Sequence, residues 1–61
     1  MSVSGKELIK ELKKAGFCIV RSRGSHCILK KNEIVVVVPN HSIDLSKGLE
    51  LSIRKKTGVY K

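Results

Sequence analysis

Two histidines and a cluster of arginines are the side chains of this sequence best suited to acid–base and phosphate chemistry. The segment Arg21-Ser22-Arg23-Gly24-Ser25-His26 places two guanidinium groups, a glycine, a hydroxyl and an imidazole within six residues. Arginine binds phosphate oxygens through permanently charged donors, and a glycine lets main-chain N–H groups approach an anion. Histidine is the side chain that can most readily take up or release a proton near neutral pH. The segment therefore predicts phosphate binding, with His26 as the candidate general acid or base for cleaving RNA without a metal ion.

A less reactive interpretation of the same segment stays open. A basic turn with one histidine also serves as a passive phosphate contact or as a solvated loop. His41, which follows Pro39-Asn40, is either a loop residue that satisfies local backbone groups or a second group for substrate binding or proton transfer. Lys30 and Lys31 add positive charge close to His26 in the sequence, so we include them among the predicted RNA contacts.

The acidic, cysteine and histidine residues predict no metal site and no cofactor. Glu33 and Asp44 lie in connections without a carboxylate partner at useful spacing. The cysteines form no C-x₂₋₄-C pair, and His26 and Cys27 are adjacent, so they point to opposite faces of a strand. A short turn between Ser22 and His26 places Cys18 opposite a residue near Lys30, not opposite Cys27, so we expect no disulfide.

Length and charge define the class of protein. The 61 residues, with 13 Lys/Arg against five Asp/Glu and a net charge of +8, fit one small basic domain over residues 1–61. This charge points to a polyanionic partner such as nucleic acid, although it also serves solubility. The apolar runs are too short to span a membrane, and nothing near the first residue has the pattern of a signal peptide, so we expect a cytoplasmic protein.

The element that precedes the arginine cluster is predicted to be an amphipathic helix. Ser4 and Glu7 form a capping box, and Val3 and Leu8 occupy the positions of a hydrophobic staple, so the helix begins at residue 5. Gly16 supplies a left-handed stop.

Three strands are predicted to position the cluster. Residues 17–22 and 26–31 are rich in β-formers and flank a turn at residues 23–25. After a tight connection at Asn32-Glu33, residues 34–38 form a run of β-branched side chains that Pro39 ends. Such a run predicts burial on both faces, or one face under helices and the other under a partner.

A second helix is predicted from about Ser46 to Thr57, with Asp44 or Ser46 as its cap and Gly58 as its stop. Leu49, Ser52, Ile53 and the stem of Lys56 share its expected inner face, and Leu51 lies opposite as a weak indication of an interface. Gly48 implies a close backbone approach or a later start of the helix. The order is α-β-β-β-α, with both helices on one face of a three-stranded sheet.

The sequence resembles the HicA family of bacterial toxins. The similarity rests on Glu7-Leu8-Ile9, Gly16-Phe17, Arg21-Ser22-Arg23-Gly24-Ser25-His26, Pro39-Asn40-His41, and a Gly48 to Ile53 helix that ends at Gly58. It implies an α+β fold like that of double-stranded-RNA-binding domains, with a three-stranded antiparallel sheet. It also implies metal-independent endonucleolytic cleavage of mRNA, His26 as the catalytic histidine, and neutralisation by a HicB antitoxin that covers the site.

The resulting hypothesis is an endoribonuclease toxin in which His26 is the general acid/base. RNA is bound by a wider set of residues: Arg21, Arg23, Gly24, Ser25, Lys30, Lys31 and His41. The alternative is a non-catalytic double-stranded-RNA-binding module, in which His26 only contacts the backbone. In a third interpretation the basic surface docks an acidic protein, with Leu51 and the third strand as contacts. An exposed strand edge leaves a homodimer open.

Overall fold

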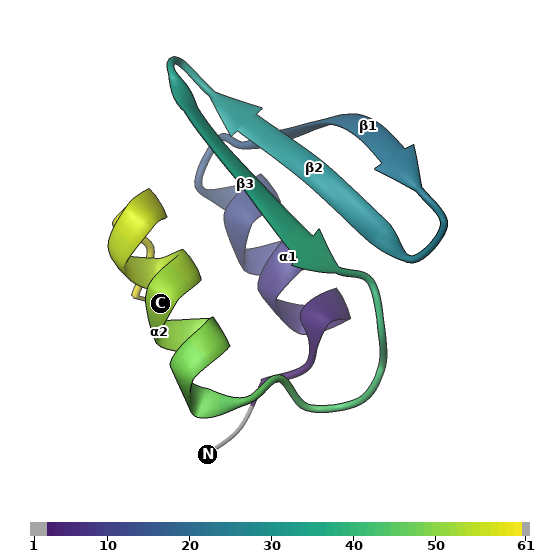
Figure 1. Cartoon of the computed structure of the whole chain (residues 1–61). Coiled ribbons are helices and arrows are strands. Elements are labelled where there is room, and N and C mark those ends of the chain that lie inside the picture. Colours follow the sequence, from purple (N-terminus) through teal and green to yellow (C-terminus); the bar gives the residue numbers. More distant parts are fainter. Residues whose placement is uncertain (1–2, 61) are drawn as a thin grey trace.

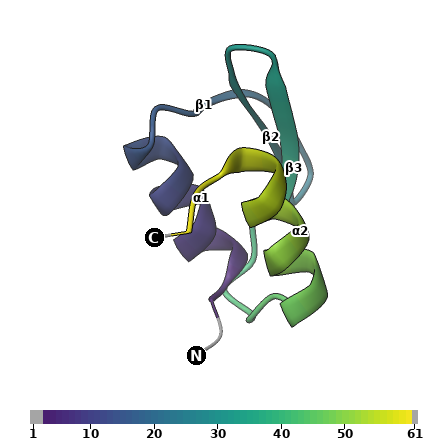
Figure 2. The same ribbon diagram turned by 90° about the vertical axis from the view of Figure 1, so that its left-hand side faces the viewer.

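The two helices and three strands form two layers in the predicted order. The structure is a computed structural model that describes residues 3–60. A three-stranded antiparallel sheet in the order β1-β2-β3 carries both helices on one face (Figures 1 and 2). The arrangement confirms the α+β fold of the double-stranded-RNA-binding-domain type. The elements are α1 (Gly5–Lys14), β1 (Cys18–Arg23), β2 (His26–Lys31), β3 (Ile34–Pro39) and α2 (Lys47–Thr57).

Both ends of α1 have the caps that the sequence predicts. The Glu7 N–H donates to the Ser4 hydroxyl at 3.2 Å, and the Ser4 N–H donates to the Glu7 carboxylate at 2.9 Å, which completes the capping box. At the other end Gly16 has a φ of 105°, and the Phe17 N–H donates to the Leu12 carbonyl at 2.9 Å. This reversal directs Phe17 into the core directly after the helix.

The strands pair through two short turns. Gly24 and Ser25 join β1 to β2, and Asn32 and Glu33 join β2 to β3. Cys18 lies opposite Lys30, as predicted, and both cysteines are free thiols.

The third strand shows an alternation that its sequence conceals. Val36 and Val38 are buried beneath the helices, whereas Val35 and Val37 are exposed on the other face. The prediction of burial on both faces is therefore wrong, and the alternative with helices on one face is correct. Pro39 does not end the strand but belongs to it, opposite His26. Edge strands tolerate proline because its missing N–H need not pair with a neighbour.

Helix α2 contributes less apolar surface to the core than its sequence suggests. The Ser46 hydroxyl caps it, since the Leu49 N–H donates to it at 3.3 Å, and Gly58, with a φ of 76°, ends it. Ile53 is buried, but Leu49 and Ser52 are exposed, so the predicted inner face is wrong at both positions. The buried neighbour of Ile53 is a charged residue, Arg54, which was not expected in the core.

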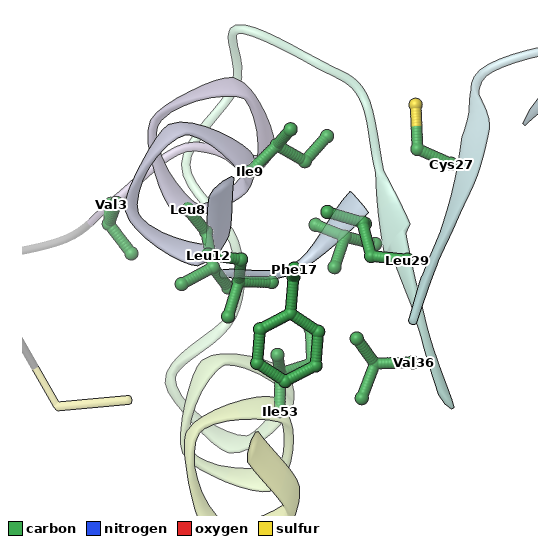
Figure 3. Packing of buried hydrophobic residues seen from close by; sticks show 10 residues of the cluster. Val3, Leu8, Ile9, Leu12, Phe17, Cys27, Leu29, Val36 and Ile53 are labelled. Atoms are coloured by element: carbon green, nitrogen blue, oxygen red, sulfur yellow. The ribbon is translucent and has the colours of Figure 1, made fainter. Parts of the chain in front are cut away.

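The core lies between the helices and the sheet. Figure 3 shows Phe17 among side chains from both helices and the sheet. Burial of the apolar core residues supplies most of the folding free energy that a domain of this size can gain. The members of the core are Val3, Leu8, Ile9, Leu12, Phe17, Cys27, Leu29, Val36, Val38 and Ile53.

Candidate functional site

His26 is the first residue of β2, directly after the turn that joins β1 to β2. Its neighbour Cys27 is buried beneath the helices, and successive side chains of a strand point to opposite faces. His26 therefore lies on the uncovered side of the sheet, where its side chain is exposed. We call this side the open face. By register and alternation its side chains are those of Cys18, Arg21, Arg23, His26, Ile28, Lys30, Val35, Val37 and Pro39.

A β-bulge at Val20 brings the two arginines to the open face. Ile19 lies opposite Leu29, but the next pair is Arg21 with Ile28, so Val20 has no partner of its own. In a strand without the bulge, Val20 would pair with Ile28, and Arg21 would lie opposite Cys27 and face the helices. With it, Arg21 and Arg23 both share the face of the histidine, and Arg23 is the direct cross-strand partner of His26.

The turn between β1 and β2 has two different roles. Gly24 has a φ of 57°, a conformation that favours glycine, and a Cβ there would meet no atom within 4 Å. The main chain at Gly24 is thus open to an approaching anion. Ser25 is half-buried, and its carbonyl accepts a hydrogen bond from the Asn40 N–H.

The segment that carries His41 is held at the same end of the sheet. The Lys6 N–H, at the start of α1, donates to the His41 carbonyl at 3.0 Å. Gly5 packs so closely that a Cβ there would overlap the Pro39 carbonyl oxygen. Farther along, the Leu45 N–H donates to the Val3 carbonyl at 2.8 Å. Main-chain contacts therefore fix the path of residues 39–45, while the His41 side chain is exposed.

The two lysines of β2 separate into different environments. Lys30 lies on the open face, opposite Cys18 and Val35. Lys31 belongs to the other end of the sheet, where its ammonium group donates to the Ala15 carbonyl at 2.7 Å and lies 5.9 Å from the centre of the Phe17 ring. A lysine at a helix C-terminus satisfies the last carbonyls and the helix dipole. Lys31 is thus separated from the site residues grouped around His26.

The middle of the open face is aliphatic. Val35 and Val37 are 40% and 49% exposed, and the half-buried Ile28 lies opposite Val37. Arginine, histidine and lysine side chains surround these three on the same face. The open face therefore joins an apolar centre to a cationic border, a combination typical of protein interfaces.

A buried ion-pair network in the helix layer has no counterpart among the predicted site residues. The Arg54 guanidinium donates to Glu11 at 2.9 Å, to Glu50 at 2.8 Å and to the Val59 carbonyl at 2.9 Å. The hydrogen bond that Arg54 donates to Glu11 raises the pKa of Arg54; burial partly offsets this rise, and the bond to Glu50 reinforces it. The spacing of Glu50 and Arg54 on one helix was the signal in the sequence. These residues join the helices and lie on the opposite side of the sheet from His26.

The helix layer carries surface hollows of its own. Two shallow hollows lie in the helix layer, one along α2 beside Leu51 and one between the end of α1 and Val59. Neither includes His26. Among residues 3–60, no three His, Cys, Asp or Glu side chains are grouped to hold a metal ion. Within the same residues, no helix has the length and apolarity needed to cross a membrane.

Comparison with known proteins gives one match. A family model described as the HicA toxin of bacterial toxin–antitoxin systems matches residues 5–59. The match includes every residue of the site described above. Searches of curated proteins and of solved structures gave no match.

Proposed function

The chain belongs to the HicA family of toxins from bacterial toxin–antitoxin systems, and we propose that it is a metal-independent endoribonuclease that cleaves mRNA. The observation that carries the proposal is the pairing of Arg23 with His26 on the open face. This register gives an exposed imidazole a guanidinium neighbour, and Arg21 adds a second one on the same strand. A proton-transfer group beside permanent cations is what phosphodiester cleavage requires.

In the proposed reaction the 2′-oxygen of RNA attacks the adjacent phosphorus. The His26 imidazole acts as general acid/base: it accepts the 2′-hydroxyl proton or donates one to the departing 5′-oxygen. The bond from phosphorus to the 2′-oxygen forms as the bond to the 5′-oxygen breaks. Arg21 and Arg23 stabilise the charge that develops on the phosphoryl oxygens. The products are a 2′,3′-cyclic phosphate and a 5′-hydroxyl.

RNA binding is proposed for the cationic part of the open face and the adjacent turn. Arg21, Arg23 and Lys30 share that face, so a single strand of RNA can cross it with its phosphates against the three cations. The exposed turn residue Gly24 and the half-buried Ser25 extend this surface past His26. Lys31 no longer belongs to the proposed contacts because its ammonium group is engaged by Ala15.

A HicB-type antitoxin is proposed to cover the same face. Ile28, Val35 and Val37 provide an apolar centre that RNA bases would not stack on, because stacking uses aromatic side chains and the open face has none. A protein surface with apolar residues and acidic groups at its border complements both parts of the face. Such a partner buries His26 and the arginines together, which accounts for neutralisation by exclusion of RNA.

Cleavage of a labelled single-stranded RNA in excess EDTA tests the function. We expect wild type to produce cyclic-phosphate and 5′-hydroxyl ends, and His26→Ala to bind RNA with the same salt dependence but to lose cleavage by about 10³-fold. Lys10→Ala, which removes an exposed charge from the helix layer, is the matched control and should retain full activity.

Two results would overturn the proposal. Products with 5′-phosphate ends that form only with Mg²⁺ would contradict the mechanism. RNA that binds to wild type without being cut would favour the non-catalytic double-stranded-RNA-binding module instead.

A further inference from the structure

We propose that His41 is a second catalytic residue, which performs the proton transfer that His26 does not. This inference rests on the proposed ribonuclease function and deepens it. Cleavage through the 2′-oxygen needs one group to remove a proton and another to supply one. Two imidazoles held beside the same phosphate can do both in one concerted step.

The structure brings the backbones of the two histidines together. Pro39 is the cross-strand partner of His26, and His41 follows two residues later. The Asn40 N–H donates to the Ser25 carbonyl, so the chain still runs beside the turn after β3 has ended. Cross-strand Cα atoms lie about 5 Å apart and two residues span at most about 7 Å, so the Cα atoms of His26 and His41 are within about 12 Å.

The position of His41 is fixed by its own main chain. Its carbonyl accepts the Lys6 N–H at 3.0 Å, and Gly5 packs against Pro39 and approaches the His41 amide nitrogen. These contacts use only backbone atoms of His41. Its imidazole has no partner among residues 3–60 and is exposed, so it is free to meet a substrate.

Charged residues lie on the elements whose backbones adjoin the two histidines. Arg21 and Arg23 come from β1, and Lys6 comes from the turn of α1 that packs against His41. Asp44 follows in the same loop and pairs with Ser4 through the backbone. The two arginines and Lys6 draw a phosphate toward the space between the histidines.

The proposed step balances with these two groups alone. One neutral imidazole takes the 2′-hydroxyl proton as the bond from the 2′-oxygen to phosphorus forms. The other histidine, as imidazolium, gives its proton to the 5′-oxygen as the bond from phosphorus to that oxygen breaks. The two histidines end in exchanged protonation states, and solvent restores them before the next turnover.

The pH dependence of kcat/KM separates this role from simple RNA binding. Wild type should give a bell-shaped profile, because one histidine must be neutral and the other protonated. His41→Gln should lower kcat by about 100-fold and abolish one limb of the bell, with a Kd for RNA within about threefold of wild type. His26→Gln should abolish the opposite limb. Ser42→Ala, in the same loop, is the control and should keep both limbs.

An RNA with a sulfur atom in place of the bridging 5′-oxygen gives an independent readout. A thiolate departs without a proton, so this substrate should restore cleavage to the variant that lacks the general acid and leave the variant that lacks the base inactive. Rescue of only one of His26→Gln and His41→Gln is the expected result.

The outcomes distinguish the inference from the function beneath it. If His41→Gln keeps a bell-shaped pH profile, whatever its rate of cleavage, His41 does not transfer a proton. The inference is then wrong, while the proposed ribonuclease function stands. If neither variant responds to the sulfur substrate, the inference is likewise wrong. If wild type fails to cleave RNA at all, it is the proposed function that fails.

Discussion

The two ends of the sheet are held together in opposite ways. At the end that carries His26, the fixed contacts are made by backbone atoms of Gly5, Lys6, Ser25, Asn40 and His41. At the far end a charged side chain makes the contact, since Lys31 donates to Ala15 and lies over the Phe17 ring. One end is thus rigid without using its reactive groups, whereas the other uses its cation for stability.

This difference separates residues that look alike in the sequence. Arg23 and Lys31 are both exposed cations on strands, but Arg23 lies free beside His26 whereas Lys31 serves a helix terminus. Because main-chain atoms make the fixed contacts near His26, the side chains of that end stay available for the proposed substrate. Four substitutions test this distinction.

The largest effect is expected for Gly5→Ala, which disrupts the backbone contacts at the end of the sheet that carries His26. The added Cβ would overlap the Pro39 carbonyl oxygen, so α1 or residues 39–41 must move. Overpacking that displaces backbone should lower the free energy of unfolding by about 3 kcal/mol, measured by urea denaturation. Gly48→Ala is the control: a Cβ there meets no atom within 4 Å, and we expect a gain of up to about 1 kcal/mol. Equal stability of both variants would contradict the close packing at Gly5.

A smaller loss is expected for Arg54→Met, which removes a cation that belongs to neither end. It leaves the half-buried Glu11 and Glu50 without their partner, at a cost of about 2–3 kcal/mol in the free energy of unfolding. Salt-dependent RNA binding should not change, because Arg54 lies on the helix side of the sheet. A change in that dependence would place the helix layer in the RNA-binding surface.

The pH dependence of this loss has a definite sign. Because the folded-state pKa of Arg54 is raised above its ordinary value, its contribution is complete below that value and disappears only in stronger alkali. The stability difference between wild type and Arg54→Met should therefore be constant from neutral pH to mildly alkaline pH, as measured by urea denaturation across this range.

The smallest effects are expected when one cation is removed from each end of the sheet. Arg23→Ala should reduce the slope of log affinity for single-stranded RNA against log salt by about 0.7, the loss of one phosphate contact, with little change in stability. Lys31→Met should lower the free energy of unfolding by about 1 kcal/mol and leave the slope unchanged. If the two variants behave alike in both measurements, the two ends do not differ in the way we describe.

Local signals predicted most of the architecture. Ser4 with Glu7, Gly16 and Gly58 mark helix ends through contacts within a few residues, and all three are confirmed. The opposition of Cys18 and Lys30 also follows from the turn length. Such features depend on short-range geometry, which a sequence displays directly.

Features that depend on tertiary competition were not predictable. The bulge at Val20 shifts the register so that both arginines share the face of His26, and no local residue marks it. In β3 every candidate side chain is aliphatic, so the alternation between Val36 and Val37 cannot be seen in residue types. Arg54 was missed as a buried residue because Glu11, its partner, lies far away in the sequence.

The candidate site was found as a set of residues but not as an arrangement. Residue types indicated His26, Arg21 and Arg23, and the structure puts them on one face. The same reasoning grouped Lys31 with them, because the sequence does not show that its ammonium group binds the Ala15 carbonyl at the end of α1. Whether His26 and His41 meet depended on the path after Pro39, which long-range backbone contacts decide.

The bond between Leu45 and Val3 has a consequence for the timing of synthesis. It joins residues about forty positions apart, so the start of α1 and the His41 segment cannot be fixed together until residue 45 has emerged. A nascent chain carries His26 long before it carries the strand and loop that complete the proposed site. The proposed site therefore stays incomplete while His26 has already left the ribosome.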